Sequence, residues 1–213
     1  MGAVFFLAVW ILFSSPAQAK EIYVGWFLDP YQDIQEAIDA AEDGIIVRDG
    51  VYAPPADGFD LQGKAIALRS WLGAANCIID GGQSKRGFVF HSGESADSKI
   101  DGFTIRNCKA EHGGGIYCYS SSPTITNCIL RSISTSHSNL LITYSNVPTE
   151  YAGETNIDLD PQFVDASSGD FRLKASSPCI DAGSNTAPSI PSQDKDGGGD
   201  SLLQARGHRH VRG

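Results

Sequence analysis

The stretch FTIRNC at residues 103–108 decides the fold class, because a close copy, PTITNC, stands at residues 123–128. Threonine, isoleucine, asparagine and cysteine agree between the two stretches at an offset of 20 residues. A further echo, TYSN at residues 143–146, places an asparagine 19 residues after Asn127. Recurrence at a nearly constant spacing is typical of a solenoid, in which each repeat forms one turn of the chain.

Short apolar runs bounded by Gly, Asn, Ser or Asp fill most of the chain, as expected for strands. We expect strands at residues 45–47, 65–69, 77–79, 88–90, 100–106, 116–119, 124–126 and 140–144. No helical pattern separates them, which disfavours βαβ units and leaves an antiparallel sandwich or a parallel coil. A sandwich would not need an asparagine at a fixed phase. The repeat, together with the echo of NCII (76–79) in NCIL (127–130), therefore favours the parallel coil.

A coil of about 20 residues per turn would stack equivalent strands ~4.8 Å apart as parallel sheets. Ile105, Ile125 and Tyr144 would then lie above one another inside the coil. At one corner, asparagine side chains would form a structural ladder, each amide bonding to the turn above or below. Asparagine also suits a corner because it tolerates the left-handed conformation. The ladder would consist of Asn107, Asn127 and Asn146.

The two ends of such a coil expose unpaired strand edges, which need covers. Asp29 before Pro30 predicts the start of a helix that runs to Ala41, with Gly44 as a stop signal. We expect this helix to cover the N-terminal end. The Pro- and Asp-rich segment 156–183 is expected to cover or close the other end.

The first 19 residues are typical of a secretory signal peptide. The apolar run at residues 3–13 is shorter than the ~20 residues that span a bilayer, and Ala17-Gln18-Ala19 forms a cleavage site. No later stretch of the sequence is long and apolar enough to cross a membrane. We therefore expect a secreted or cell-surface protein, with a β-helix domain at residues 20–183 and a flexible tail at 184–213.

Several stretches resemble a known group of proteins. Residues 31–130, with IQEAIDAAEDG (34–44), IDGFTIRNC (100–108) and GGGIYCYSSSPTITNC (113–128), resemble secreted right-handed parallel β-helix proteins of the pectin-lyase-like superfamily. The segment 156–183, with DLDPQFVD, GDFRL and SSPCIDAG, resembles the C-terminal part of the bacterial surface proteins called choice-of-anchor Q. The resemblance implies an all-β, right-handed parallel β-helix that is shorter than its relatives, and it makes carbohydrate the preferred ligand class.

The catalytic signatures of that superfamily are missing. There is no Asp-Asp pair, and HGGG at residues 112–115 only loosely resembles a Gly-His-Gly element. A lyase would need a base such as Arg106 beside an acid such as Asp101. The remaining weak candidates, Glu111 and His112, could join them with Glu94 and Asp97 if adjacent coils brought these groups together. Enzymatic activity is therefore left open, with the balance against it.

Composition limits the partners. The chain of 213 residues carries a net charge of −9, whereas a nucleic-acid binder needs a basic face to displace counterions. Asp194, Asp196 and Asp200 match three positions of a calcium loop. The twelfth position is Ala205 instead of a bidentate Glu, so at most a weak calcium contact is expected. No other cofactor is expected.

Cysteines and aromatic residues leave alternatives open. Cys108 and Cys128 would share one phase of the coil, as a disulfide or as stacked thiols. The odd number of cysteines leaves at least one thiol free, and the other three are Cys77, Cys118 and Cys179. Four aromatic side chains could stack on sugar rings, although strand aromatics more often pack. These are Trp26, Trp71, Tyr117 and Tyr119.

The sequence thus predicts an exported β-helix module with a structural or binding role, directed at a polysaccharide or a cell-surface glycan. One alternative is a polysaccharide lyase or glycoside hydrolase with an unfamiliar catalytic pattern. Another is a fragment of a longer surface adhesin. The sequence alone gives neither the ligand nor the oligomeric state.

Overall fold

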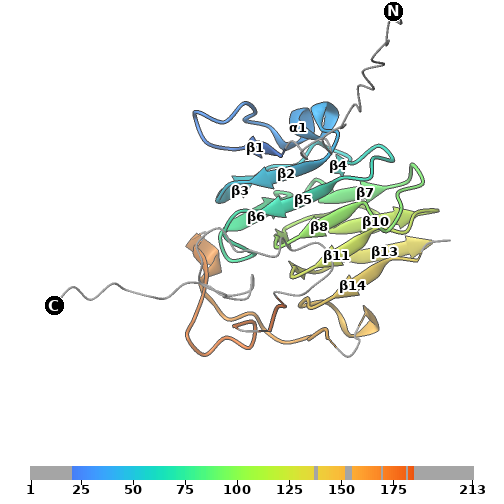
Figure 1. Cartoon of the computed structure of the whole chain (residues 1–213). Coiled ribbons are helices and arrows are strands. Elements are labelled where there is room, and N and C mark those ends of the chain that lie inside the picture. Colours follow the sequence, from blue (N-terminus) through green and yellow to red (C-terminus); the bar gives the residue numbers. More distant parts are fainter. Residues whose placement is uncertain (1–20, 137–138, 152–154, 169, 181, 185–213) are drawn as a thin grey trace, which may run out of the picture.

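The computed structural model describes residues 21–136, 139–151, 155–168, 170–180 and 182–184. In these residues the chain coils as a parallel β-solenoid with three sheets along its length (Figure 1). Sheet A contains β1 (Ile22–Val24), β2 (Gly44–Val47), β5 (Ala67–Ser70), β8 (Lys99–Asp101), β11 (Thr124–Thr126) and β14 (Leu141–Thr143). Sheet B contains β3 (Gly50–Tyr52), β6 (Cys77–Asp80), β9 (Thr104–Arg106) and β12 (Ile129–Leu130). Sheet C contains β4 (Phe59–Asp60), β7 (Phe88–Phe90), β10 (Ile116–Tyr119) and β13 (Ile133–Ser136). The prediction of an all-β parallel β-helix is confirmed.

The register of the sheets corrects the predicted 20-residue offset. Ile125 pairs with Ile100 and Ile142, whereas Ile105 pairs with Leu130. The predicted column of Ile105, Ile125 and Tyr144 is therefore wrong. The cause is a corner at Gly102, where φ is 78°, which divides the expected strand 100–106 into β8 and β9.

The two copies of the repeat consequently lie in different sheets. Residues 104–106 form β9 in sheet B, and residues 124–126 form β11 in sheet A. The other echo is structurally equivalent, because Ile78 and Ile129 both pair with Thr104, one from each side. Similar sequences thus precede the corner after a sheet A strand and the corner after a sheet B strand. Sequence similarity alone does not distinguish the two corners.

Coil length varies along the solenoid. Ile45, Leu68, Ile100, Ile125 and Ile142 stack in one column of sheet A, separated by 23, 32, 25 and 17 residues. The strands stay in phase because the extra residues lie in the connecting loops. No constant period describes the chain.

The interior is an apolar column. The rings of Phe59 and Phe88 lie 5.6 Å apart between their centroids, and Phe88 also contacts Phe90 and Phe103 at 6.3 and 6.4 Å. All four side chains are buried. Each contributes about 1.5–3 kcal/mol through burial, which makes this cluster a main source of stability.

The helix α1 (Ile34–Ala40) covers the N-terminal end of the coil (Figure 1), burying Ile34, Ala37 and Ile38. It begins later than predicted, because Asp33 rather than Asp29 is the N-cap residue. The Asp33 carboxylate accepts hydrogen bonds from the backbone N–H groups of Gln35 and Glu36 at 2.7 and 3.1 Å. Asp29 instead pairs with Arg48, whose Nε lies 3.2 Å from its carboxylate.

The C-terminal segment extends the coil and then packs along its side. The N–H of Ile157 donates to the carbonyl of Ser145, and the N–H of Val147 donates to the carbonyl of Ile157. Beyond the turn η1 (Thr149–Tyr151), the segment forms the antiparallel pair β15 (Phe163–Asp165) and β16 (Asp170–Leu173), linked through η2 (Ala166–Ser168). Leu173 and Cys179 then pack with Ile129, on the outer side of sheet B.

All five cysteines lie within the described residues, and no two of them form a disulfide there. Cys108 follows β9 in sheet B and Cys128 follows β11 in sheet A, so these two do not share one phase of the coil. The possible disulfide between them is therefore absent. The predicted signal peptide and the calcium candidates Asp194, Asp196 and Asp200 lie outside the described residues.

Candidate functional site

A groove of about 510 Å³ runs along the outer face of sheet C. Its walls come from three successive coils, which supply β4, β7 and β10 with the loops beside them. In Figure 1, β4, β7 and β10 follow one another down the right side of the coil. The lining residues are Asp57, Gly58, Asp60, Arg86, Val89, His91, Tyr117 and Tyr119.

The alternation of the strands explains why these side chains share a face. Phe59, Phe88 and Ile116 pair with one another and point inward, where all three are buried. Their neighbours Asp60, Val89 and Tyr117 are also paired in register, and successive residues of a strand face opposite sides. The inner row anchors the strands in the core, so the outer row is held as a rigid surface.

Tyr117 and Tyr119 give the groove its aromatic surface. They lie two residues apart on β10, where they alternate with the buried Ile116 and Cys118, and therefore share a face. The Tyr119 side chain is 45% exposed. Tyrosine rings of this kind offer an apolar face together with a hydroxyl at the edge.

Arg86 is fixed beside Tyr117. Its guanidinium carbon lies 4.9 Å from the centre of the Tyr117 ring. Its nitrogens donate to backbone carbonyls, with Nε 3.3 Å from Gly113 O, Nη2 3.1 Å from His112 O and Nη1 3.5 Å from Asp57 O. These contacts hold the Tyr117 ring and tie loops of three coils together.

Asp60 and His91 form a polar pair at the other side of the groove. Nε2 of His91 lies 3.2 Å from Oδ2 of Asp60. The Asp60 backbone is clamped by Gln35 of α1, which accepts from its N–H at 3.0 Å and donates to its carbonyl at 3.0 Å. The second oxygen of Asp60 accepts from the N–H of Gln62 at 2.8 Å. The helix that covers the coil thus also positions a groove residue.

Asp57 adds a second carboxylate to the groove. Its side chain is exposed, and among the described residues no hydrogen bond or ion pair engages its carboxylate. Carboxylates, an imidazole and tyrosine hydroxyls together can exchange hydrogen bonds with hydroxyl groups of a ligand. The arrangement suits a polar ligand that also has an apolar face.

The predicted catalytic candidates do not line this groove. Asp101 ends β8 in sheet A and is buried, and its Oδ1 accepts from Thr126 Oγ1 at 2.9 Å and Asn127 Nδ2 at 2.8 Å. Burial raises its pKa, against the effect of these hydrogen bonds. Arg106 ends β9 in sheet B, where it pairs with Asp80 at 2.6 Å. Asp101 and Arg106, the weak candidates for lyase chemistry, thus lie in different sheets and have different partners.

Glu111 and His112 lie exposed in the loop between β9 and β10, and the His112 carbonyl accepts a hydrogen bond from Arg86. In the described part of the chain, no three His, Cys, Asp or Glu residues are placed to hold a metal ion.

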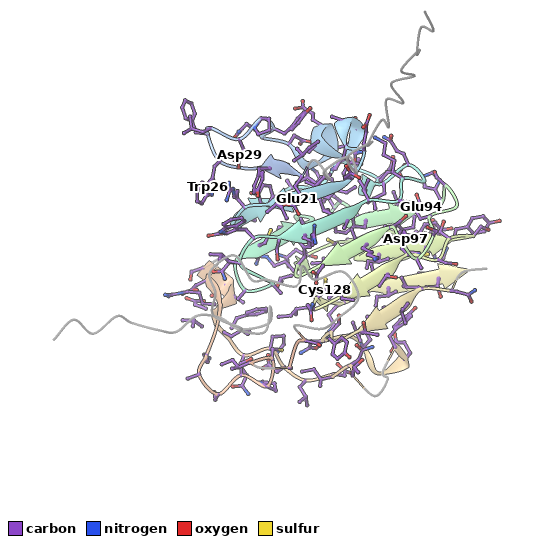
Figure 2. The ribbon with its side chains drawn as sticks, in the orientation of Figure 1. Glu21, Trp26, Asp29, Glu94, Asp97 and Cys128 are labelled. Atoms are coloured by element: carbon purple, nitrogen blue, oxygen red, sulfur yellow. The ribbon has the colours of Figure 1, made fainter. Side chains whose placement is uncertain are left out.

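Glu94 has a structural role that the sequence did not indicate. It is buried in the loop between β7 and β8, on the opposite side of the molecule from Trp26 and Asp29 (Figure 2). Its carboxylate accepts from the N–H groups of Gly63 and Ser92 at 2.9 and 3.0 Å and from the Ser121 hydroxyl at 2.8 Å. Burial alone would raise its pKa, but these hydrogen bonds outweigh it and lower the pKa. Glu94 therefore joins three coils.

The predicted asparagine ladder is wrong for the same reason as the predicted 20-residue offset, because the repeated stretches lie in different sheets. Asn107 and Asn127 do adopt the left-handed conformation, with φ of 49° and 52°. Asn107 bonds to Asp80 and Gln83, whereas Asn127 bonds to Asp101. Asn146 donates to the carbonyl of Leu159 and to the Cys179 sulfur. Asn107 and Asn127 follow β9 and β11, whereas Asn146 pairs with Ile129 of β12 through an isolated bridge, so the three side chains form no common ladder.

The two tryptophans considered as sugar platforms pack instead on Arg48. The guanidinium carbon lies 4.4 Å from each of the Trp26 and Trp71 ring centres. Tyr117 and Tyr119 are thus the aromatic candidates that the structure brings into a groove. Sequence reasoning did not indicate Asp57, Asp60, Arg86 or His91, which come from loops and strand ends of two different coils.

Comparisons with family models, with curated proteins and with solved structures gave no match. The likeness that the structure itself supports is the coarser one, to parallel β-solenoids. In the described ranges, no helix has the length and apolarity that crossing a bilayer requires.

Proposed function

We propose that this protein is an exported β-helix module that binds carbohydrate in the groove of sheet C. The observation that carries the proposal is the position of Tyr117 and Tyr119 on one rigid face, beside the hydrogen-bonded pair of Asp60 and His91. Sugar rings present apolar C–H faces to aromatic rings and hydroxyl groups to polar side chains. A site that combines both kinds of group is therefore suited to a glycan.

The shape of the face also favours an extended ligand. Adjacent strands of a sheet lie ~4.8 Å apart, so the three strands of the groove extend it by about 10 Å across the sheet. The backbone is held by the core below, which reduces the ordering cost of binding. We further propose that the chain is a shortened relative of the pectin-lyase-like superfamily with a C-terminal part like choice-of-anchor Q proteins, and that it acts outside the cell. The sequence stretches given above support this assignment.

The test is binding of the purified protein to a panel of neutral, acidic and amino-sugar oligosaccharides, measured by calorimetry. Tyr119→Ala should weaken the best ligand about tenfold, because loss of an aromatic contact of about 1.4 kcal/mol corresponds to that factor. Phe27→Ala is the matched control, since Phe27 is 93% exposed and does not line the groove. Absence of binding to every oligosaccharide, or equal losses in both variants, would contradict the proposal.

A second candidate function is hydrolysis or lysis of a polysaccharide in the same groove. It is favoured by the presence of two carboxylates, Asp57 and Asp60, with His91 at one face, since glycoside cleavage uses paired acids and bases. Release of new reducing or unsaturated ends during incubation would support the enzyme. Binding without product would favour the module.

A further inference from the structure

The charges in the sheet C groove are unequally available to a ligand. The groove residues include two acids, Asp57 and Asp60, and one residue that is always cationic, Arg86. Which ligand charge is preferred depends on which of these groups can still form contacts.

Arg86 is already engaged. All three guanidinium nitrogens donate to backbone carbonyls, and one face of the group lies against the Tyr117 ring. Arginine recognises a carboxylate best through two parallel N–H groups of its fork. The Nε and Nη2 edge of Arg86 is already used by the carbonyls of Gly113 and His112, so three of the five N–H groups are engaged.

In contrast to Arg86, one of the two carboxylates of the groove is still available to a ligand. Asp60 shares its oxygens between His91 and the N–H of Gln62, whereas the exposed Asp57 carboxylate has no partner among the described residues. A cationic group of a ligand could therefore pair with Asp57 without breaking any contact. The net charge of −9 adds a long-range attraction for cations and repels anions.

The tyrosines reinforce this preference. A cation close to the face of an aromatic ring is attracted by the ring quadrupole, as Arg86 already is by Tyr117. Tyr119 offers a second, 45% exposed ring in the same groove.

From these contacts we infer that the groove selects glycans that carry ammonium groups, as oligomers of an amino sugar do, over glycans that carry carboxylates. This inference rests on the proposed carbohydrate binding and names its substrate class. A uronate oligomer would meet an unpaired carboxylate at Asp57, and an Arg86 whose Nε and Nη2 already donate to backbone carbonyls.

The experiment compares three hexamers of similar length by calorimetry in one buffer, at a pH where the amines are protonated. The probes are de-N-acetylated chitohexaose, its fully N-acetylated form and hexagalacturonate. We expect the de-N-acetylated hexamer to bind about tenfold more tightly than the acetylated one, and hexagalacturonate to bind most weakly. Tighter or equal binding of either other hexamer would overturn the inference but leave carbohydrate binding intact. Failure of all three to bind would overturn both proposals.

Two variants test whether the preference for the de-N-acetylated hexamer arises in the groove. Asp57→Asn should weaken the de-N-acetylated hexamer about fivefold and leave the acetylated hexamer within twofold. Asp97→Asn removes an exposed acid outside the groove and should change neither. Raising the salt concentration should weaken binding of the de-N-acetylated hexamer and leave the neutral acetylated hexamer unchanged, because screening reduces the attraction between exposed opposite charges. Equal losses in both variants would show a general charge effect and contradict selection at this site.

Discussion

Nε2 of His91 lies 3.2 Å from Oδ2 of Asp60, 31 residues away in the chain and on the neighbouring coil of sheet C. The pair is brought together because β4 and β7 are adjacent parallel strands, with Asp60 opposite Val89. His91 stands two residues beyond Val89 and therefore faces the same side of the sheet. The solenoid thus assembles a polar site from residues with no spacing motif.

The first prediction concerns this pair. His91→Ala should weaken glycan binding about tenfold while leaving the melting temperature nearly unchanged, because a polar contact at the surface contributes only about 0–1 kcal/mol to stability. The control is His112→Ala, which removes another exposed imidazole but keeps the carbonyl that Arg86 needs. Calorimetry and thermal unfolding measure the two effects. Stronger loss of binding in His112→Ala would move the site to the loop between β9 and β10.

The second prediction concerns Glu94. Glu94→Gln should destabilise the protein by about 1–3 kcal/mol, because the amide cannot accept from Gly63, Ser92 and Ser121 together. The folded-state pKa of Glu94 lies below its ordinary value of 4.5, so the folded state binds fewer protons than the unfolded chain. Its contribution to stability is therefore present above about pH 4.5 and is lost as the pH falls through the lower folded pKa.

Urea unfolding of both proteins at several pH values checks this. The stability difference between them should shrink on acidification. Asp97→Asn, an exposed change in the same loop, should show neither effect. A constant difference down to strongly acidic pH would argue against an ionised clamp.

The third prediction has the opposite sign and concerns Asp101. Burial raises its folded-state pKa above the ordinary 3.8, and its Oδ2 has no hydrogen-bond partner in the described residues. The ionised form therefore reduces stability as the pH rises through the folded pKa, and stability is recovered at lower pH. Asp101→Asn removes the charge and keeps an oxygen for Thr126 and Asn127, so it should not lower stability at neutral pH.

Asp101→Ala is the matched variant for this position. It leaves the buried Thr126 hydroxyl and Asn127 amide without their acceptor and should cost about 1–3 kcal/mol. Chemical unfolding at neutral pH separates the two variants. Equal destabilisation by Asn and Ala would mean that the charge itself is required.

The fourth prediction concerns the corner between β8 and β9. A Cβ at Gly102 would lie 2.4 Å from Ser70 Oγ, on a residue with φ of 78°. Gly102→Ala should therefore cost about 3 kcal/mol, the sum of conformational strain and local crowding. Gly82→Ala is the control, because Gly82 also has positive φ (57°) but meets nothing within 4 Å. It should cost only about 1 kcal/mol in the same unfolding measurement, and similar costs at both positions would show that the corner is not tightly packed.

The sequence was sufficient for the fold class because short apolar strands and left-handed asparagines are local features. FTIRNC and PTITNC each contain an asparagine with positive φ just before the final cysteine, as predicted for a corner. Their relative placement was wrong because Gly102, one residue before FTIRNC, adds a corner that similarity does not reveal. The number of residues between equivalent strands depends on the lengths of the connecting loops. These lengths vary so much here that the spacing of one coil does not predict the spacing of the next.

For the candidate site too, the sequence did not show which residues of different coils lie next to one another. Tyr117 and Tyr119 were identifiable as a pair, because they alternate with Ile116 and Cys118 on one strand. Asp60 and His91 lie on different coils, and only the register of β4 with β7 shows that they meet. Acidic residues close in sequence, such as Glu94 and Asp101, instead took separate structural roles.

The most direct test of the central claim is a crystal structure of the protein soaked with the tightest-binding hexasaccharide. The account predicts sugar rings in the sheet C groove, stacked on Tyr117 or Tyr119, with a polar group within hydrogen-bond distance of Asp57, Asp60 or His91. Sugar density at another surface, or none in this groove at a saturating concentration, would contradict it.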